Sequence, residues 1–163
     1  MTPRYWVDTN VILDHLLGRP PLYQASRDLI EPGYHRKAEI LVTPASVATV
    51  LYVLQRKKSA RKPGPDLNKV RHALLQLLQV VEVIPMERSD FSWSANSHFL
   101  DLEDGAQYSA AMGSGRLDAL VTNNKADFPN VTPPLWDAAE ALAAFKAHAG
   151  RPRYVAKRQR RKR

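Results

Sequence analysis

Short apolar runs alternate with longer amphipathic segments along most of this chain. The runs Tyr5–Val7, Ile40–Thr43, Val80–Ile84 and Leu117–Thr122 have the length and apolar character of buried strands. Between them, apolar residues recur at helical spacing, which predicts helices starting near residue 8 and over 22–30, 44–58, 67–78, 89–99, 102–112 and 136–148. This alternation of strand and helix predicts a mostly parallel sheet covered on both faces.

Proline, glycine and capping residues mark the predicted helix ends. Pro32-Gly33 is expected to end the second helix, and Asp66 to cap the helix that follows Pro63-Gly64-Pro65. That helix carries an apolar stripe expected to face the core, made of Leu67, Val70, Leu74, Leu77 and Leu78. No segment is long enough to separate two domains, so one domain over residues 1–149 and a tail over 150–163 are expected.

Composition narrows the class of protein. Of 163 residues, 44% are hydrophobic, which is enough to form a buried core, and none is cysteine. The absence of cysteine excludes disulfides, a thiolate zinc site and a cysteine nucleophile. No apolar run is long enough to span a bilayer, and the opening Met-Thr-Pro-Arg lacks the apolar stretch of a signal peptide. A cytoplasmic protein with no membrane partner is therefore expected.

The formal net charge of +8 belongs to the C-terminal tail. Eight of the 24 Lys and Arg residues lie between Arg151 and Arg163, and the other basic residues balance the 16 acidic ones. Arg153, Arg158, Arg160 and Arg161 are candidates for binding RNA phosphates, since phosphate neutralisation gives affinity without sequence readout. A solvated chain end and docking to an acidic partner are the alternatives.

Acidic residues follow the predicted strands at equivalent places. Asp8 follows the first strand, Asp101 and Asp104 stand at the start of a helix, and Asp127 follows the fourth strand. In a parallel sheet these places lie at one edge, where carboxylates repel one another unless a divalent cation lies between them. The alternatives are a helix cap at Asp8, a capping box from Asp101 to Asp104, and a turn residue at Asp127.

Polar neighbours of these acids are candidates for a supporting role. Asn10, Thr122 and Asn124 are expected to orient the carboxylates or to hold a phosphate oxygen, with local loop hydrogen bonding as the alternative. Small residues after Asp104, beginning with Gly105, would let that helix pack closely and fix the carboxylate. Asp14 is expected to lie behind the site or on the surface, and Glu103 to face solvent.

Other catalytic patterns are absent from the sequence. It contains neither a Gly-x-x-x-x-Gly-Lys loop nor a Gly-x-Gly-x-x-Gly loop, and no Gly-x-Ser-x-Gly elbow. The histidines His15, His35, His72, His98 and His148 show no spacing typical of paired metal ligands. A phosphatase of the haloacid dehalogenase type would use Asp8 as nucleophile, but it normally has a second Asp two residues later, where Asn10 stands.

Three stretches resemble motifs of the PIN-domain ribonucleases. They are Val7–Asp14 with Leu16–Arg19, Asp101–Ala111, and Leu120–Phe128, in the order and spacing of that family. The resemblance implies a three-layer α/β/α sandwich with a central, mostly parallel sheet of four to five strands. It also implies an endoribonuclease that uses Mg²⁺ or Mn²⁺, with Asp8, Asp104 and Asp127 as catalytic and metal-binding acids.

The same resemblance bears on partners. Many bacterial members are toxins of VapBC-type pairs, so RNA and a cognate antitoxin are the implied partners, and the oligomeric state, a homodimer included, stays open. The chain departs from the family pattern at Thr49, where a glutamate is usual. With threonine at this position, the number of bound metal ions, one or two, stays open. The alternative that Thr49 favours is a PIN-like RNA-binding or protein-interaction module with weak or no catalysis.

Overall fold

A parallel sheet of five strands forms the centre of the computed structural model, which describes residues 2–56 and 66–149. The strands are β1 (Arg4–Val7), β2 (Glu39–Val42), β3 (Val81–Val83), β4 (Ala119–Val121) and β5 (Leu135–Trp136). Their order is β3-β2-β1-β4-β5, and every neighbouring pair is parallel. The predicted sheet is confirmed. Trp136 was expected to begin a helix, but it pairs with Val121 as part of β5.

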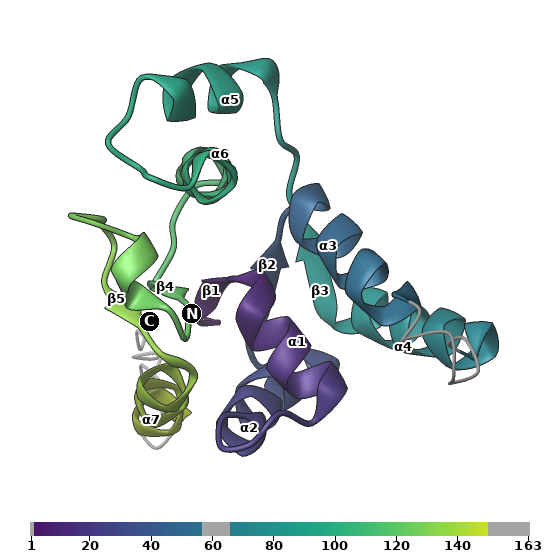
Figure 1. Ribbon diagram of the computed structural model, residues 1–163. Coiled ribbons are helices and arrows are strands. Elements are labelled where there is room, and N and C mark those ends of the chain that lie inside the picture. Colours follow the sequence, from purple (N-terminus) through teal and green to yellow (C-terminus); the bar gives the residue numbers. More distant parts are fainter. Residues whose placement is uncertain (1, 57–65, 150–163) are drawn as a thin grey trace, which may run out of the picture.

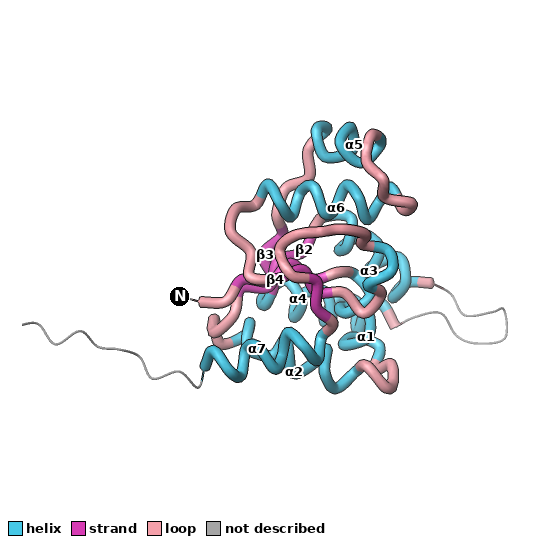
Figure 2. The backbone as a smooth tube through the Cα atoms, turned by 90° about the vertical axis from the view of Figure 1, so that its left-hand side faces the viewer, coloured by secondary structure: helices cyan, strands magenta, loops and turns pink. Residues whose placement is uncertain are grey.

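Helices cover both faces of this sheet and give three layers (Figures 1 and 2). One face packs against α1 (Thr9–Leu17), α2 (Tyr23–Tyr34), α3 (Pro44–Gln55), α4 (Leu67–Val80) and α7 (Ala138–Ala149). The other face packs against α6 (Leu102–Gly113), over which lies α5 (Arg88–Ala95). No helix within residues 2–56 and 66–149 has the length and apolarity needed to cross a bilayer.

Alternate residues of β1, β2, β4 and β5 enter two separate cores. Tyr5 and Val7 of β1 face the core that includes α1, α2 and α7, whereas Trp6 between them faces the core under α6. Burial of an aromatic side chain such as Trp6, which is 0% exposed, contributes on the order of 3 kcal/mol to folding. After their first residues, Arg4 and Glu39, β1 and β2 are apolar and buried at every position, which is why their short apolar runs were recognisable in the sequence.

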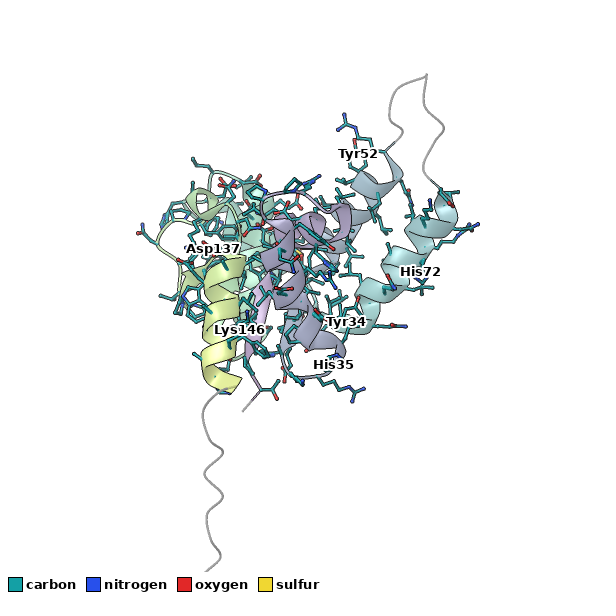
Figure 3. The ribbon with its side chains drawn as sticks, turned by 90° about the horizontal axis from the view of Figure 1, so that it is seen from below. Tyr34, His35, Tyr52, His72, Asp137 and Lys146 are labelled. Atoms are coloured by element: carbon teal, nitrogen blue, oxygen red, sulfur yellow. The ribbon has the colours of Figure 1, made fainter. Side chains whose placement is uncertain are left out.

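Some predicted helix faces are more exposed than their spacing indicated. On α4, Leu67 is 51% exposed and Leu78 is 44% exposed, although Val70 and Leu77 are buried. Figure 3 shows that α3 and α4, marked by Tyr52 and His72, lie on the side of the molecule opposite α7, at the periphery of the described part of the chain. The second helix also continues through Pro32 to Tyr34, two residues past the expected stop.

The strand order reverses next to β1. The chain moves from β1 to β2 to β3 in one direction, and then returns across the sheet to place β4 on the opposite side of β1. Ligands of open parallel sheets bind outside the carboxyl ends of the strands at such a reversal. The residues that follow β1 and β4 are Asp8 and Thr122, so the topology brings the first predicted acid to the expected ligand position.

Candidate active site

Asp8 is held at the strand reversal by side chains from two segments. It stands at the N-cap position of α1, yet its side chain makes no capping hydrogen bond. Instead its Oδ2 atom accepts hydrogen bonds from Asn10 Nδ2 at 2.5 Å and Thr122 Oγ1 at 2.7 Å, and the residue is 5% exposed. Helix capping therefore does not explain this carboxylate. Its buried position is maintained by long-range contacts between α1 and the end of β4.

Asn10 and Thr122 also fasten the loop that follows β4. Asn10 Nδ2 donates to Thr122 Oγ1 at 3.0 Å, and Asn10 Oδ1 accepts from the backbone N–H of Asn123 at 3.0 Å. Thr122 Oγ1 accepts from the backbone N–H of Asn124 at 3.0 Å. The expected orienting role of Asn10 and Thr122 agrees with these contacts, and local loop bonding, the alternative, occurs at the same atoms.

Asn123 and Asp14 form a link that sequence reasoning missed. Asn123 Nδ2 donates to Asp14 Oδ2 at 2.8 Å, and Asn123 Oδ1 accepts from the backbone N–H of Ala138 at 3.3 Å. Asp14 is 6% exposed, so the expected surface position is wrong, and its position behind the site stays a prediction. The only signal in the sequence was a charged residue on the apolar side of α1, beside Leu13.

Two acidic residues at the start of α6, Asp101 and Asp104, have different hydrogen-bonding environments. Asp101 caps the helix, because its Oδ1 atom accepts from the backbone N–H groups of Glu103 at 2.8 Å and Asp104 at 3.4 Å. The Asp104 carboxylate returns no hydrogen bond to Asp101, and no donor in the described part of the chain reaches it. The capping interpretation therefore accounts for Asp101, not for Asp104.

Gly105 lets α6 pack closely at this point. A Cβ atom added there would lie 2.5 Å from Ser94 Oγ and 3.1 Å from Phe99 Cβ. The prediction of a close approach is confirmed, and the neighbours are α5 and the segment after it. Because the backbone next to Asp104 is packed this tightly, the carboxylate cannot easily move away from the strand ends.

Asp127 enters from the short 3-10 helix η1 (Lys125–Asp127). Its Oδ2 atom accepts a hydrogen bond from Asn124 Nδ2, so Asn124 orients Asp127 and not Asp8. The next residue, Phe128, is 3% exposed, and its ring lies 5.7 Å from that of Trp6, centroid to centroid. Phe128 thus anchors the exposed carboxylate to the core, as expected for the motif that ends in Asp127-Phe128.

The charges of the three acids affect one another's pKa values. Burial raises the pKa of Asp8 to about 6, and the charge of Asp127 adds to this rise, while the hydrogen bond from Thr122 opposes it. Burial also raises the pKa of Asp104 to about 7, with further increases from the charges of Asp8, Asp101, Asp127 and Glu103. Within residues 2–56 and 66–149, no ion pair with Lys or Arg offsets the negative charge of these three acids.

A divalent cation is the group whose chemistry fits this excess charge. Within residues 2–56 and 66–149, no three acidic or histidine side chains stand close enough to form a complete metal cage. Mg²⁺ does not require one, because it binds through one or two carboxylates and completes its shell with water and substrate phosphate. The oxygen-only donor set of Asp8 and Asp104, with Asp127 nearby, meets that requirement.

Glu103 is exposed, as expected, and it also contacts two side chains. Although exposed, its Oε1 atom accepts hydrogen bonds from Thr49 Oγ1 and from Gln107 Nε2, each at 3.4 Å. Thr49 is the position at which the sequence departs from the family pattern. The neutral residue on α3 is therefore in contact with a carboxylate supplied by α6.

Surface hollows lie elsewhere. One of about 160 Å³ is lined by Tyr5, Arg116, Asp118, Trp136 and His148, among others, near the start of β1 and before β4, and contains none of the three acids. At the sheet edge, Asp8 is buried, Asp104 is half-buried and Asp127 is exposed. The tail candidates Arg153, Arg158, Arg160 and Arg161 lie outside the described residues.

Comparisons with known proteins identify the family and agree with the topology. A family profile described as PIN domain matches residues 4–126, a range that contains Asp8 and Asp104 and ends just before Asp127. A search among curated proteins found no match.

Two solved structures share the fold. One is that of VapBC2 from Rickettsia felis bound to a DNA fragment from their promoter, with a TM-score of 0.58, 18% identity, and coverage of 82% of this chain and 98% of that chain. The other is PAE2754 from Pyrobaculum aerophilum, with a TM-score of 0.63, 17% identity, and coverage of 90% and 92%. At these identities the likeness concerns the fold.

Proposed function

This chain belongs to the PIN domain family, and we propose that it is an endoribonuclease dependent on Mg²⁺ or Mn²⁺ and the toxin of a toxin–antitoxin pair. The observation that carries the proposal is the buried carboxylate of Asp8 at the strand reversal, where Asn10 and Thr122 donate hydrogen bonds to it. The raised pKa values of Asp8 and Asp104, to which the charge of Asp127 adds, support a site that a divalent cation would stabilise.

The side chains of the candidate site would have different roles in binding the cation. Asp8 and Asp104 would hold the cation, and Asp127, oriented by Asn124, would add a ligand or position a water. Asn10 and Thr122 both donate to Oδ2 of Asp8, and the backbone N–H groups of Thr9 and Asn10 also stabilise this carboxylate, so its orientation is fixed before any cation binds. A bound cation would supply the positive charge that offsets the charge developing on a scissile phosphodiester.

The basic tail supports a polyanionic substrate. Residues 151–163 hold eight basic residues and no acidic one, while the site itself is acidic. A long polymer can contact both regions, because its backbone charges can lie against the tail while one phosphate enters the site. Arg153, Arg158, Arg160 and Arg161 are the proposed phosphate contacts, and they add affinity without sequence readout.

Cleavage of defined RNA by the full-length protein tests the enzyme. We expect cleavage of single-stranded RNA with Mg²⁺ or Mn²⁺, none with EDTA, and none for Asp8→Asn or Asp104→Asn. The matched control is Asp28→Asn, which removes a carboxylate on α2 that is bonded only to Gln24. A DNA oligonucleotide of the same sequence distinguishes an RNA enzyme from a general nuclease. Cleavage that survives in both acidic-site variants would refute the proposal.

Thr49 favours one other function, a PIN-like module that binds RNA or protein without cutting. In that case the wild type would bind RNA equally well with and without metal, and no product would accumulate at any metal concentration. The raised pKa values would then be an electrostatic cost without a catalytic use. The same titrations, followed by a gel-shift assay and by product analysis, decide between the two functions.

The toxin assignment needs a biological measurement. Induced expression should arrest bacterial growth, the Asp8→Asn variant should not, and co-expression of the protein encoded beside this chain should restore growth and form a purified complex with it. Growth arrest that persists in the Asp8→Asn variant would separate toxicity from the proposed chemistry. Normal growth with an active nuclease would leave the enzyme assignment intact and remove the toxin assignment.

A further inference from the structure

Asn123, in the loop after β4, contacts α1 at two points. Its backbone N–H donates to Asn10 Oδ1 at 3.0 Å, and its side-chain Nδ2 donates to Asp14 Oδ2 at 2.8 Å. Asn10 and Asp14 are four residues apart, so they lie on the same face of the helix, one turn from each other. Two contacts one turn apart fix the position of Asn123 along α1, which a single hydrogen bond would not do.

The side-chain amide of Asn123 matches two partners of opposite kind. The carboxylate of Asp14, when ionised, can only accept a hydrogen bond, whereas the backbone N–H of Ala138 can only donate one, and it donates to Asn123 Oδ1 at 3.3 Å. Turning the amide over would place two acceptors against each other at one end and two donors at the other. The side chain therefore connects α1 to the start of α7 in one orientation.

Asp14 is a buried acidic residue whose side-chain partner comes from this loop. It is 6% exposed, and within residues 2–56 and 66–149 no Lys or Arg forms an ion pair with it. A buried carboxylate lowers stability unless hydrogen bonds compensate for the water that it has lost. Asn123 supplies such a bond, so the energetics of burying Asp14 depend on the position of the loop after β4.

The residues on either side of Asn123 each hold one acid of the candidate site. Thr122 Oγ1 donates to Asp8 Oδ2 at 2.7 Å, and Asn124 Nδ2 donates to Asp127 Oδ2. Three consecutive residues thus contact Asp8, α1 and Asp127 in turn. A shift of Asn123 along α1 would displace both of the neighbouring donors, and would change the spacing of the two carboxylates that they hold.

We propose that Asn123 and Asp14 form a positioning pair, which sets the spacing between the carboxylates of Asp8 and Asp127 and thereby the affinity of the site for its cation. The inference rests on the proposed function, because it concerns the same divalent cation. Neither member of the pair is a ligand: both act through the residues that flank Asn123. The buried Asp14 carboxylate holds the loop after β4 in register with α1.

Binding of Mn²⁺ alone to the full-length protein, measured by calorimetry, tests the pair without relying on cleavage. Asn123→Ala should weaken binding about tenfold, the lower end of the loss typical of groups that orient metal ligands, while the number of sites per molecule stays that of the wild type. A partly unfolded variant would instead bind with wild-type affinity at fewer sites. The control is Ser109→Ala, which removes a hydrogen bond of the same length, 2.8 Å, to Asp90 on α5, and should leave the affinity unchanged.

Exchange of the two side chains provides the sharper test. In the double variant Asp14→Asn/Asn123→Asp, the amide on α1 can donate to the carboxylate on the loop, whose other oxygen can still accept from the backbone N–H of Ala138. Its affinity for Mn²⁺ should be close to that of the wild type. Asp14→Ala/Asn123→Asp has the same net charge but no donor at position 14, and should bind about tenfold more weakly than the exchanged pair.

Three outcomes would each overturn the inference: an unchanged affinity in Asn123→Ala, equal losses from Asn123→Ala and Ser109→Ala, or equal affinities of the two charge-matched double variants. If Asp8→Asn abolishes Mn²⁺ binding while Asn123→Ala leaves it unchanged, the cation site stands and only the positioning role fails. If the wild type binds no Mn²⁺ at concentrations up to millimolar, the proposed function and this inference fail together.

Discussion

Replacing Asp104 with asparagine should stabilise the metal-free protein at pH 8. The carboxylate has its pKa raised from 3.8 to about 7. At 1.36 kcal/mol for each pKa unit, this corresponds to about 4 kcal/mol of destabilisation by the charged form. The side chain is only partly buried, so screening by solvent reduces the figure to about 2 kcal/mol. For a chain of this size, that gain raises the melting temperature by about 4–8 °C.

The stabilisation should depend on pH in a defined direction. Because the pKa of Asp104 is higher in the folded state than its ordinary value of 3.8, the folded protein holds a proton that the unfolded chain has released between about pH 4 and pH 7. Raising the pH through that window destabilises the wild type, and Asp104→Asn lacks this loss. The advantage of the variant is therefore full at pH 8 and disappears near pH 4.

Thermal melts in EDTA at pH 8 and near pH 4 measure this difference. Asp28→Asn, outside the acidic site, serves as the control and should shift little at either pH. Saturating Mn²⁺ should reverse the order at pH 8, because a ligand at 100 times its Kd adds about 2.7 kcal/mol to the wild type, and the variant loses the ligand. A variant that is less stable than the wild type at pH 8 in EDTA, or one with the same advantage at both values of pH, would refute the electrostatic reasoning.

Three other perturbations have expected outcomes. Gly105→Ala should lower the free energy of unfolding by about 1–2 kcal/mol, since the new Cβ atom would lie 2.5 Å from Ser94 Oγ. The control is Gly113→Ala on the same helix, whose Cβ atom would meet nothing within 4 Å and which should be neutral or stabilising. Urea melts compare the two variants, and equal effects would contradict the packing argument. Asn123→Ala should lower the free energy of unfolding by about 1–3 kcal/mol, because it leaves the buried Asp14 carboxylate unpaired. Adding Asp14→Asn should recover part of this loss, so additive losses in the double-mutant cycle would contradict a hydrogen bond between the two side chains. Truncation after Ala149 should make RNA affinity fall less steeply with salt while cleavage at saturating RNA persists, and identical salt slopes for both chains would show that the tail does not touch RNA.

Part of the fold was predictable because its signals are local. The central strands are buried on both faces, so their sequences are continuous apolar runs. The start of α6 was predictable from Asp101, because aspartate is a preferred N-cap residue and Asp101 does cap this helix. The exposure of Leu67 and Leu78 was not predictable, because the same spacing of apolar residues occurs in a helix that is packed against neighbours on one flank and in one that is packed on two. β5 was missed because two residues carry no periodicity, and only pairing with β4 makes them a strand.

The same division runs through the candidate site. By itself, the sequence determined which residues can carry the chemistry: three aspartates placed after strands or at a helix start, with Asn10, Thr122 and Asn124 beside them. Only the tertiary structure decided what each one does. It assigned Asp101 to capping and Asn124 to Asp127, joined Asn123 to Asp14, and placed Glu103 against Thr49. The physical reason is that hydrogen bonds and desolvation depend on distances between segments far apart in the chain, and those distances exist only after the sheet has formed.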